Sequence, residues 1–113
     1  MKIKQYEIWT ANLDPRFGTE SGKVRPVVVI QTELLNNIHP STIVCPITTK
    51  LNLESEILRV HLNKGTANLK ENCDILVDQI RAIDNKRLSK RLGKLPENII
   101  SILKNNVSAI LDL

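Results

Sequence analysis

Short runs of β-branched and other apolar residues recur along this chain about every ten to twenty residues, with polar turn-like segments between them. Runs of this length are typical of strands rather than helices. They predict strands at residues 6–13, 25–31, 42–48, 57–62 and 73–83. Short strands at this spacing indicate a small antiparallel barrel or sandwich.

The run at 57–62 has the clearest period of two. Leu58, Val60 and Leu62 alternate with the polar residues Arg59 and His61. Because successive side chains of a strand point to opposite faces, we expect the three apolar residues to face the core.

The C-terminal segment has helical spacing instead, and Pro96 stands where the first residue of a helix tolerates proline. We expect one amphipathic helix over 96–111, and a short helical turn at 85–88 capped by Asp84 or Asn85. The predicted fold class is therefore mainly β with a C-terminal helix (α+β). The apolar stripe of the helix comprises Ile99, Ile102, Leu103, Val107, Ile110 and Leu111.

A chain of 113 residues with 42% hydrophobic content can bury one core, so we expect a single domain over 1–113. No apolar run approaches the roughly 18 residues that span a bilayer, and no signal peptide is evident. We therefore expect a cytoplasmic protein without a membrane segment. Cys45 and Cys73 lack a CxxC spacing and a nearby His cluster, which predicts reduced, buried thiols and neither a metal site nor a cofactor.

Charge is distributed unevenly along the chain, whose formal net charge is +4. Between residues 85 and 95 there are five basic residues and no acid: Lys86, Arg87, Lys90, Arg91 and Lys94. This segment is either an ordinary solvated face or part of a surface that attracts phosphates.

An arginine and a proline, Arg25-Pro26, directly precede the apolar run of the second predicted strand. Proline cannot donate to a sheet, so it belongs at a strand start or edge, and it holds Arg25 extended at the rim. The preceding residues, 14–23, contain a proline, two glycines and mixed charges, which predict a loop. One reading of Arg25 is a charge that protects an apolar strand from edge pairing, and the other is a functional group.

Two further predicted strands carry polar residues that are able to bind or react. The third predicted strand is followed by Thr48, Thr49 and Lys50. In the fifth, Gln79 and Arg81 are two residues apart, which places them on one face of the strand.

The segments "GKVRPVVVIQ", "IVCPITT" and "ILVDQIRAID", in this order, resemble the MazF/PemK family of toxin endoribonucleases, also called mRNA interferases. The resemblance covers nearly the whole chain, from "YEIWTANLDPRFGTESG" to the C-terminal helix. It implies an SH3-like antiparallel barrel, a homodimer, sequence-specific and metal-independent cleavage of single-stranded mRNA, and inhibition by an acidic antitoxin.

Carried over by position, the resemblance implies Arg25 and Thr48 as catalytic residues, with Glu20 in the preceding loop as a third. It implies RNA contacts by a further set: Gly22, Pro26, Thr49, Lys50, Gln79 and Arg81. A groove lined by Arg25, Lys50 and Arg81 would attract RNA phosphates and also the acidic antitoxin segment.

Metal-free RNA cleavage uses the neighbouring 2′-OH as nucleophile and leaves 2′,3′-cyclic phosphate and 5′-OH ends. Arginine has a planar fork of donors for phosphate oxygens but is a poor proton acceptor, so Arg25 is expected to clamp the phosphate. Glu20 is the candidate acceptor of the 2′-OH proton, and Thr48 is a candidate donor to the phosphate or proton relay. His39 in a turn and His61 on the outer face of a strand do not adjoin these motifs, which disfavours a two-histidine mechanism.

Two alternatives belong to other functional classes. One is a nonenzymatic gyrase poison of the CcdB type on the same fold, which has no evident need for Arg25-Pro26 and Thr48. The other is an SH3-like peptide adaptor, whose groove needs more aromatic residues than Tyr6, Trp9 and Phe17 supply.

Overall fold

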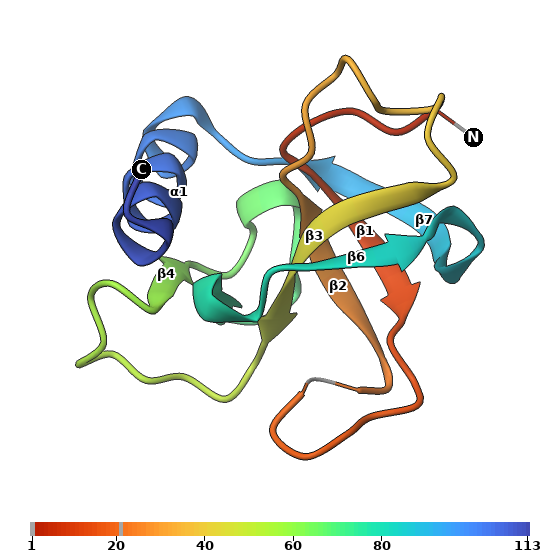
Figure 1. The fold of residues 1–113 in the computed structure, drawn as a ribbon. Helices are drawn as coiled ribbons and strands as arrows, with labels where there is room; N and C mark the ends of the chain where they lie inside the picture. Colours follow the sequence, from red (N-terminus) through yellow and green to blue (C-terminus); the bar gives the residue numbers. More distant parts are fainter. Residues whose placement is uncertain (1, 21) are drawn as a thin grey trace.

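The computed structural model describes residues 2–20 and 22–113, so Ser21 of the predicted loop lies outside the described residues. Three single turns of 3-10 helix lie between the later strands: η1 (Thr66–Asn68), η2 (Val77–Gln79) and η3 (Asn85–Arg87). The main elements are β1 (Glu7–Asn12), β2 (Val24–Val29), β3 (Ser41–Thr48), β4 (Arg59–Leu62), β5 (Cys73–Leu76), β6 (Arg81–Asp84), β7 (Leu88–Lys94) and α1 (Glu97–Leu111) (Figure 1).

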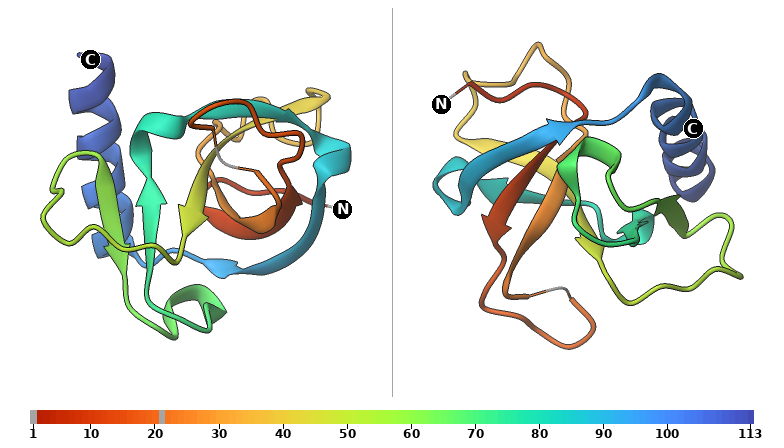
Figure 2. Two further views of the ribbon diagram at one scale, coloured as in Figure 1. Left: turned by 90° about the horizontal axis from the view of Figure 1, so that it is seen from below. Right: turned by 180° about the vertical axis from the view of Figure 1, so that it is seen from behind.

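All pairings in the sheet are antiparallel, and the strand order is β4-β5-β3-β2-β1-β7, with β6 also paired to β3. The strands curl around a common interior (Figure 2). The prediction of a mainly β fold with a C-terminal helix is confirmed. The path of pairings among the described strands does not return to its start, so the sheet is barrel-like but not closed.

The prediction of one continuous strand over 73–83 is wrong. The chain leaves β5 at Leu76, makes the turn η2, and resumes as β6 at Arg81. Both pieces pair with β3, β5 near its end at 47–48 and β6 near its start at 41–44. The turn allows the chain to follow a bending β3 with two short strands, and it also means that Gln79 and Arg81 do not share one strand face.

The strand β2 is buried on both faces, which explains its uninterrupted apolar run. Val28 lies in the larger core cluster, to which α1 contributes Ile100 and Leu103. Val27 and Val29 point the other way, into a second cluster with Trp9. A strand covered on both sides requires apolar residues at every position.

The strand β4 starts later than its sequence pattern predicted. Val60 and Leu62 are buried as expected, but Leu58 is 46% exposed and belongs to the preceding loop. Buried and exposed side chains alternate only where β4 pairs with β5, because strand pairing determines to which face of the sheet each side chain points.

The helix α1 forms where predicted and packs beside β4 (Figure 1). Pro96 is the residue before the first turn rather than its first residue. Ile100 and Leu103 are its buried residues, whereas the predicted Ile102 and Leu111 are about half exposed. The predicted cap at Asp84 is confirmed, since its carboxylate accepts a hydrogen bond from the Lys86 N–H at 2.8 Å.

Much of the basic segment forms β7, an edge strand that the sequence pattern did not predict. It pairs with β1 and exposes Lys90, Arg91 and Lys94. A charged edge discourages pairing with another chain. Gly93 is required on this strand because a Cβ there would lie 2.8 Å from the backbone of Ala67.

Both cysteines are free and buried, as predicted. Burial, together with the nearby Asp78 carboxylate, raises the pKa of the Cys45 thiol to about 12. Among the described residues, no helix combines the length and apolar character that crossing a bilayer requires.

Candidate functional site

A cleft of about 540 Å³ lies where the β1–β2 loop meets the end of β3. This loop and the β3–β4 loop extend on the same side of the molecule, the lower side in Figure 1. The described residues that line the cleft come from five parts of the chain: Arg16, Thr19, Glu20, Gly22, Lys23, Val24, Arg25, Pro26, Ile47, Thr48, Thr49, Lys50, Arg59, Leu76 and Gln79.

Arg25 reaches the cleft from β2, where it pairs with Ala11 of β1. Its Nε donates a hydrogen bond of 2.8 Å to the Gly22 carbonyl, which fixes the guanidinium relative to the loop. Gly22 itself packs tightly inside the loop, because a Cβ there would lie 2.6 Å from the Arg16 side chain and 2.8 Å from Asp14 Oδ1. The half-buried Arg25 is thus a pre-oriented cation in the cleft wall.

Thr48 is the last residue of β3 and is half-buried, while Thr49 and Lys50 follow it on the exposed turn. Thr48 Oγ1 accepts a hydrogen bond from the Lys50 N–H at 3.1 Å. Because a hydroxyl both accepts and donates, its own hydrogen is available for a second group in the cleft.

The loop that carries Glu20 is tied down at its base and near its tip. At the base, Lys23 N–H donates to Asp14 Oδ1 at 2.6 Å, and the Arg87 side chain donates to the Asn12 carbonyl at 2.9 Å and to the Asp14 carbonyl. Near the tip, Gln79 Nε2 donates to the Thr19 carbonyl at 3.2 Å. Glu20 itself is exposed and lines the cleft.

The lining is strongly basic. Among the described lining residues, one is acidic, Glu20, and five are basic: Arg16, Lys23, Arg25, Lys50 and Arg59. Concave surfaces with one sign of charge concentrate ions of the opposite sign, so the cleft favours a polyanion.

The structure brings together eight of the residues selected from the sequence: Glu20, Gly22, Arg25, Pro26, Thr48, Thr49, Lys50 and Gln79. Arg81 does not line the cleft. It lies on β6 opposite Val44, with its Nη1 buried and without a hydrogen-bond partner among the described residues, and its RNA contact stays a prediction. Neither His39 nor His61 is among the lining residues.

Sequence reasoning missed three of the basic residues in the cleft: Arg16, Lys23 and Arg59. Arg16 and Lys23 belong to the loop that was predicted to carry function, so proximity to Arg25 in the sequence was an available signal. For Arg59 the sequence offered no such signal, because polar positions of an alternating strand are expected to face solvent.

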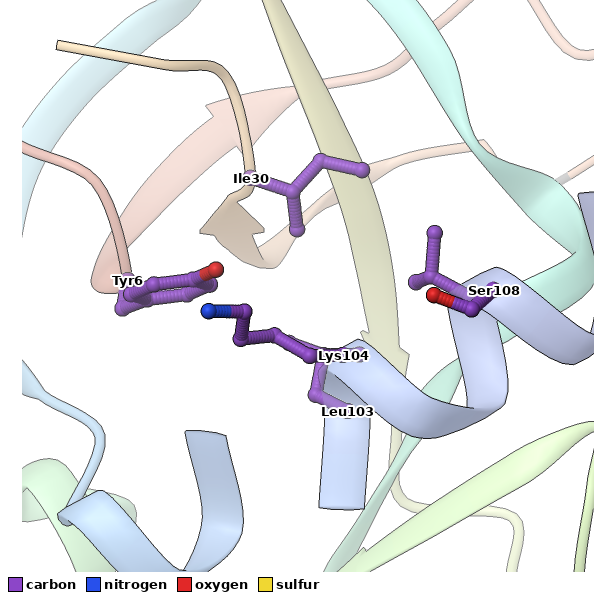
Figure 3. A pocket seen from close by; sticks show the side chains of 6 residues that line it. Tyr6, Ile30, Leu103, Lys104 and Ser108 are labelled. Carbon is purple, nitrogen blue, oxygen red and sulfur yellow. The ribbon is translucent and has the colours of Figure 1, made fainter. Parts of the chain in front are cut away.

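A second, smaller hollow of about 210 Å³ lies between α1 and the ends of β1 and β2 (Figure 3). Its lining is mainly apolar, and Lys104 extends from α1 toward the ring of Tyr6. Burial raises the pKa of Tyr6. None of the residues selected from the sequence for function lies in this hollow.

Within residues 2–20 and 22–113 there is no group of three or more His, Cys, Asp or Glu side chains placed to hold a metal ion. The side chains that the cleft offers to a ligand are guanidinium and ammonium groups, hydroxyls, one amide and one carboxylate. These groups bind phosphate oxygens and transfer protons.

Residues 4–111 match the family model described as PemK-like, MazF-like toxin of type II toxin-antitoxin system. A curated relative, Endoribonuclease MazF of Staphylococcus epidermidis, is 35% identical over 111 residues, which cover 98% of this chain and 92% of that protein.

Solved structures have the same fold. MazF from Deinococcus radiodurans matches with a TM-score of 0.85 at 19% identity, over 100% of this chain and 99% of that one. A mycobacterial endoribonuclease in complex with its cognate antitoxin matches with a TM-score of 0.79 at 12% identity, over 96% of this chain and 94% of that one.

Proposed function

The chain belongs to the PemK-like, MazF-like toxin family of type II toxin–antitoxin systems and is an endoribonuclease of that family, and we propose that it cleaves single-stranded mRNA without a metal ion. The proposed products are 2′,3′-cyclic phosphate and 5′-hydroxyl ends. The observation that carries this proposal is the basic cleft in which Arg25, Thr48 and Glu20 converge from three parts of the chain.

Arg25 is the phosphate clamp of the proposed mechanism. Its Nε is bonded to the Gly22 carbonyl, so the two remaining nitrogens of the guanidinium fork are held at the cleft wall. A fixed planar fork matches two phosphate oxygens and stabilises the negative charge that grows on them as the 2′ oxygen attacks.

Thr48 and Glu20 are the hydrogen-bonding and proton-transfer groups of the proposed mechanism. The Thr48 hydroxyl already accepts from Lys50, so it donates its own hydrogen to a phosphate oxygen or relays a proton to the departing 5′ oxygen. Glu20 accepts the 2′-OH proton, as the one carboxylate among the described lining residues. The O2′–P bond forms while the P–O5′ bond breaks, which yields the cyclic phosphate, and the departing 5′ oxygen takes up a proton, relayed by Thr48 or supplied by water, to become the 5′-hydroxyl.

The same geometry favours single-stranded RNA. In-line attack requires the 2′ oxygen, phosphorus and 5′ oxygen to align, and an A-form duplex holds the backbone away from that arrangement. The exposed loop residues around the cleft, at 14–24 and 50–56, are the proposed source of base preference.

The proposed partners are an acidic antitoxin and a second copy of the chain. A basic cleft that attracts RNA phosphates also attracts an acidic segment, which would block the cleft when bound. One structural neighbour is a mycobacterial endoribonuclease in complex with its cognate antitoxin. We place the reaction in the cytoplasm, where mRNA is found.

The test is incubation of the purified protein with a long single-stranded RNA in EDTA, followed by sequencing of the cuts and analysis of their ends. We expect discrete cuts with cyclic-phosphate and 5′-hydroxyl ends, and their loss in Arg25→Ala. Lys104→Gln, which removes a charge from α1 outside the cleft, is the matched control and should cut like the wild type. Intact RNA with a folded wild-type protein would refute the proposal and would direct the next assay to DNA gyrase.

A further inference from the structure

Beside the proposed catalytic residues lies a buried ionic network centred on Asp74. The Asp74 side chain is fully buried, yet it accepts three hydrogen bonds. The donors are the Asn52 N–H at 2.9 Å, Arg59 Nη1 at 2.9 Å, and His61 Nδ1, which lies 2.6 Å from Oδ1. Burial alone would raise the pKa of Asp74, but these three donors together lower it, so the group is a carboxylate.

Strand register places this network next to Thr48. Thr48 of β3 pairs with Asp74 of β5, and Asp74 pairs on its other side with His61 of β4. Side chains of directly opposed residues share one face of a sheet, and Arg59, two residues before His61, is on that face as well. The proposed catalytic threonine and the network therefore occupy the same face.

The network also fixes the β3–β4 loop. Arg59 Nη1 donates to the Lys50 carbonyl at 2.9 Å, His61 Nε2 lies 3.1 Å from the Ser55 carbonyl, and the Asn52 N–H is held by Asp74. Three points of the loop that borders the cleft are thereby tied to β4 and β5.

Arg59 lines the cleft and its side chain is 21% exposed. Both of its bonds to Asp74 and Lys50 use the same nitrogen, Nη1. A guanidinium has five N–H donors, so a group anchored through one nitrogen retains donors for an oxygen ligand. In the strand order β4-β5-β3-β2, the strand β4, which starts at Arg59, and the strand β2, which carries Arg25, lie on opposite sides of β3, which ends at Thr48.

We propose that Arg59 is a second phosphate-binding residue of the cleft and that Asp74 is the positioning residue that holds it there. This inference rests on the proposed function, since it assigns Arg59 to a neighbouring phosphate of the same RNA. Arg25 binds the phosphate that reacts, and Arg59 binds the strand on the other side of Thr48. The reacting atoms are then held from both sides.

The experiment measures binding of a short fluorescein-labelled RNA that spans a mapped cut and has 2′-deoxyribose at the attacking nucleotide, by anisotropy over a series of salt concentrations. Each phosphate contact to single-stranded nucleic acid contributes about 0.7 to the slope of log affinity against log salt. We expect Arg59→Gln to bind about tenfold more weakly and to lower the slope by about 0.7. Arg59→Lys should keep the slope and recover part of the affinity, and Lys104→Gln is the control for loss of a distant charge.

The substitution Asp74→Asn distinguishes the positioning of Arg59 by Asp74 from the effect of the Asp74 charge on the local field. Removing a negative charge near the cleft strengthens RNA binding if only the local field matters, whereas loss of the anchor weakens it. We expect weaker binding with an unchanged slope, because Arg59 keeps its charge. If Asp74→Asn does not fold, the two Arg59 variants still decide the assignment of the phosphate contact.

The outcomes distinguish this inference from the proposed function. If the wild type cuts RNA but Arg59→Gln has the slope and affinity of Lys104→Gln, Arg59 has only a structural role and the inference is wrong. If the wild type neither cuts nor binds the RNA, the proposed function fails and the inference fails with it.

Discussion

The substitution Asp74→Asn also tests the account of the fold, through its effect on stability. The carboxylate is fully buried and pairs with Arg59, whose side chain is 21% exposed, and with His61, whose side chain is 38% exposed. Asparagine keeps the volume and one acceptor oxygen but leaves the arginine without its counter-charge, and its amide nitrogen faces donors.

The size of the effect follows from these exposures. Removing one partner of a fully buried ion pair costs about 3–5 kcal/mol. Water reaches both the Arg59 and the His61 side chain here and compensates part of the loss, so we expect the free energy of unfolding to fall by about 2–3 kcal/mol at neutral pH. In urea that corresponds to a midpoint lower by about 1–2 M.

The effect should depend on pH with a definite sign. The pKa of Asp74 is lowered in the folded protein, so its stabilising contribution is complete above the unfolded value of about 3.9 and is lost as pH falls through the folded value. The asparagine variant has no such group. The stability difference between wild type and variant should therefore shrink as pH falls below about 4.

The assay is urea unfolding followed by circular dichroism, at one protein concentration, at neutral and at acidic pH. Glu54→Gln is the control, because Glu54 is an exposed carboxylate in the β3–β4 loop, and it should change the stability by less than about 0.5 kcal/mol. A difference for Asp74→Asn below about 1 kcal/mol at neutral pH, or one that does not shrink in acid, would refute the reasoning.

Three further predictions concern packing and the buried thiol. Gly93→Ala places a Cβ 2.8 Å from the Ala67 backbone and should lower the free energy of unfolding by about 1–3 kcal/mol in urea, whereas wild-type stability would contradict the close approach. Cys45, fully buried and with a pKa of about 12, should react with a thiol reagent such as dithionitrobenzoate only in urea, and rapid labelling of the native protein at this residue would count against its burial. Leu103→Ala, at a position 1% exposed, should cost about 2–5 kcal/mol, while Ile102→Ala, 46% exposed, should cost under about 1 kcal/mol, and equal losses would contradict the packing of α1.

The parts of the fold that depend on local pattern were predictable. Val27, Val28 and Val29 predict a buried strand, although β2 starts at Val24, two residues before Pro26. The amphipathic C-terminal segment similarly predicts α1, although its buried residue Ile100 was not in the predicted stripe.

The parts that depend on pairing were not predictable. The strand β7 is mostly polar and basic, and only its place beside β1 makes it a strand. The sequence pattern predicts one continuous strand over 73–83, but the turn η2 interrupts it. The interruption follows from β3, which pairs with β5 near its end and with β6 near its start, and the residues at 73–83 do not encode that arrangement.

The same division holds for the candidate site. Arg25 and Thr48 could be selected because each ends or begins an apolar strand within a recognisable motif. Asp74 and Arg59 could not, since a polar residue in an alternating strand is expected to face solvent. Their burial and their access to the cleft depend on β4, β5 and the β3–β4 loop meeting in three dimensions.

The measurement that tests the central claim most directly is cleavage, in EDTA, of an RNA carrying a single 2′-deoxyribose at the nucleotide whose 2′-OH attacks at a mapped cut. The account predicts that this cut disappears, that other cuts in the same RNA persist with 5′-hydroxyl ends, and that Arg25→Ala makes none of them. A cut that survives the deoxy substitution, or that leaves a 5′-phosphate, would contradict it.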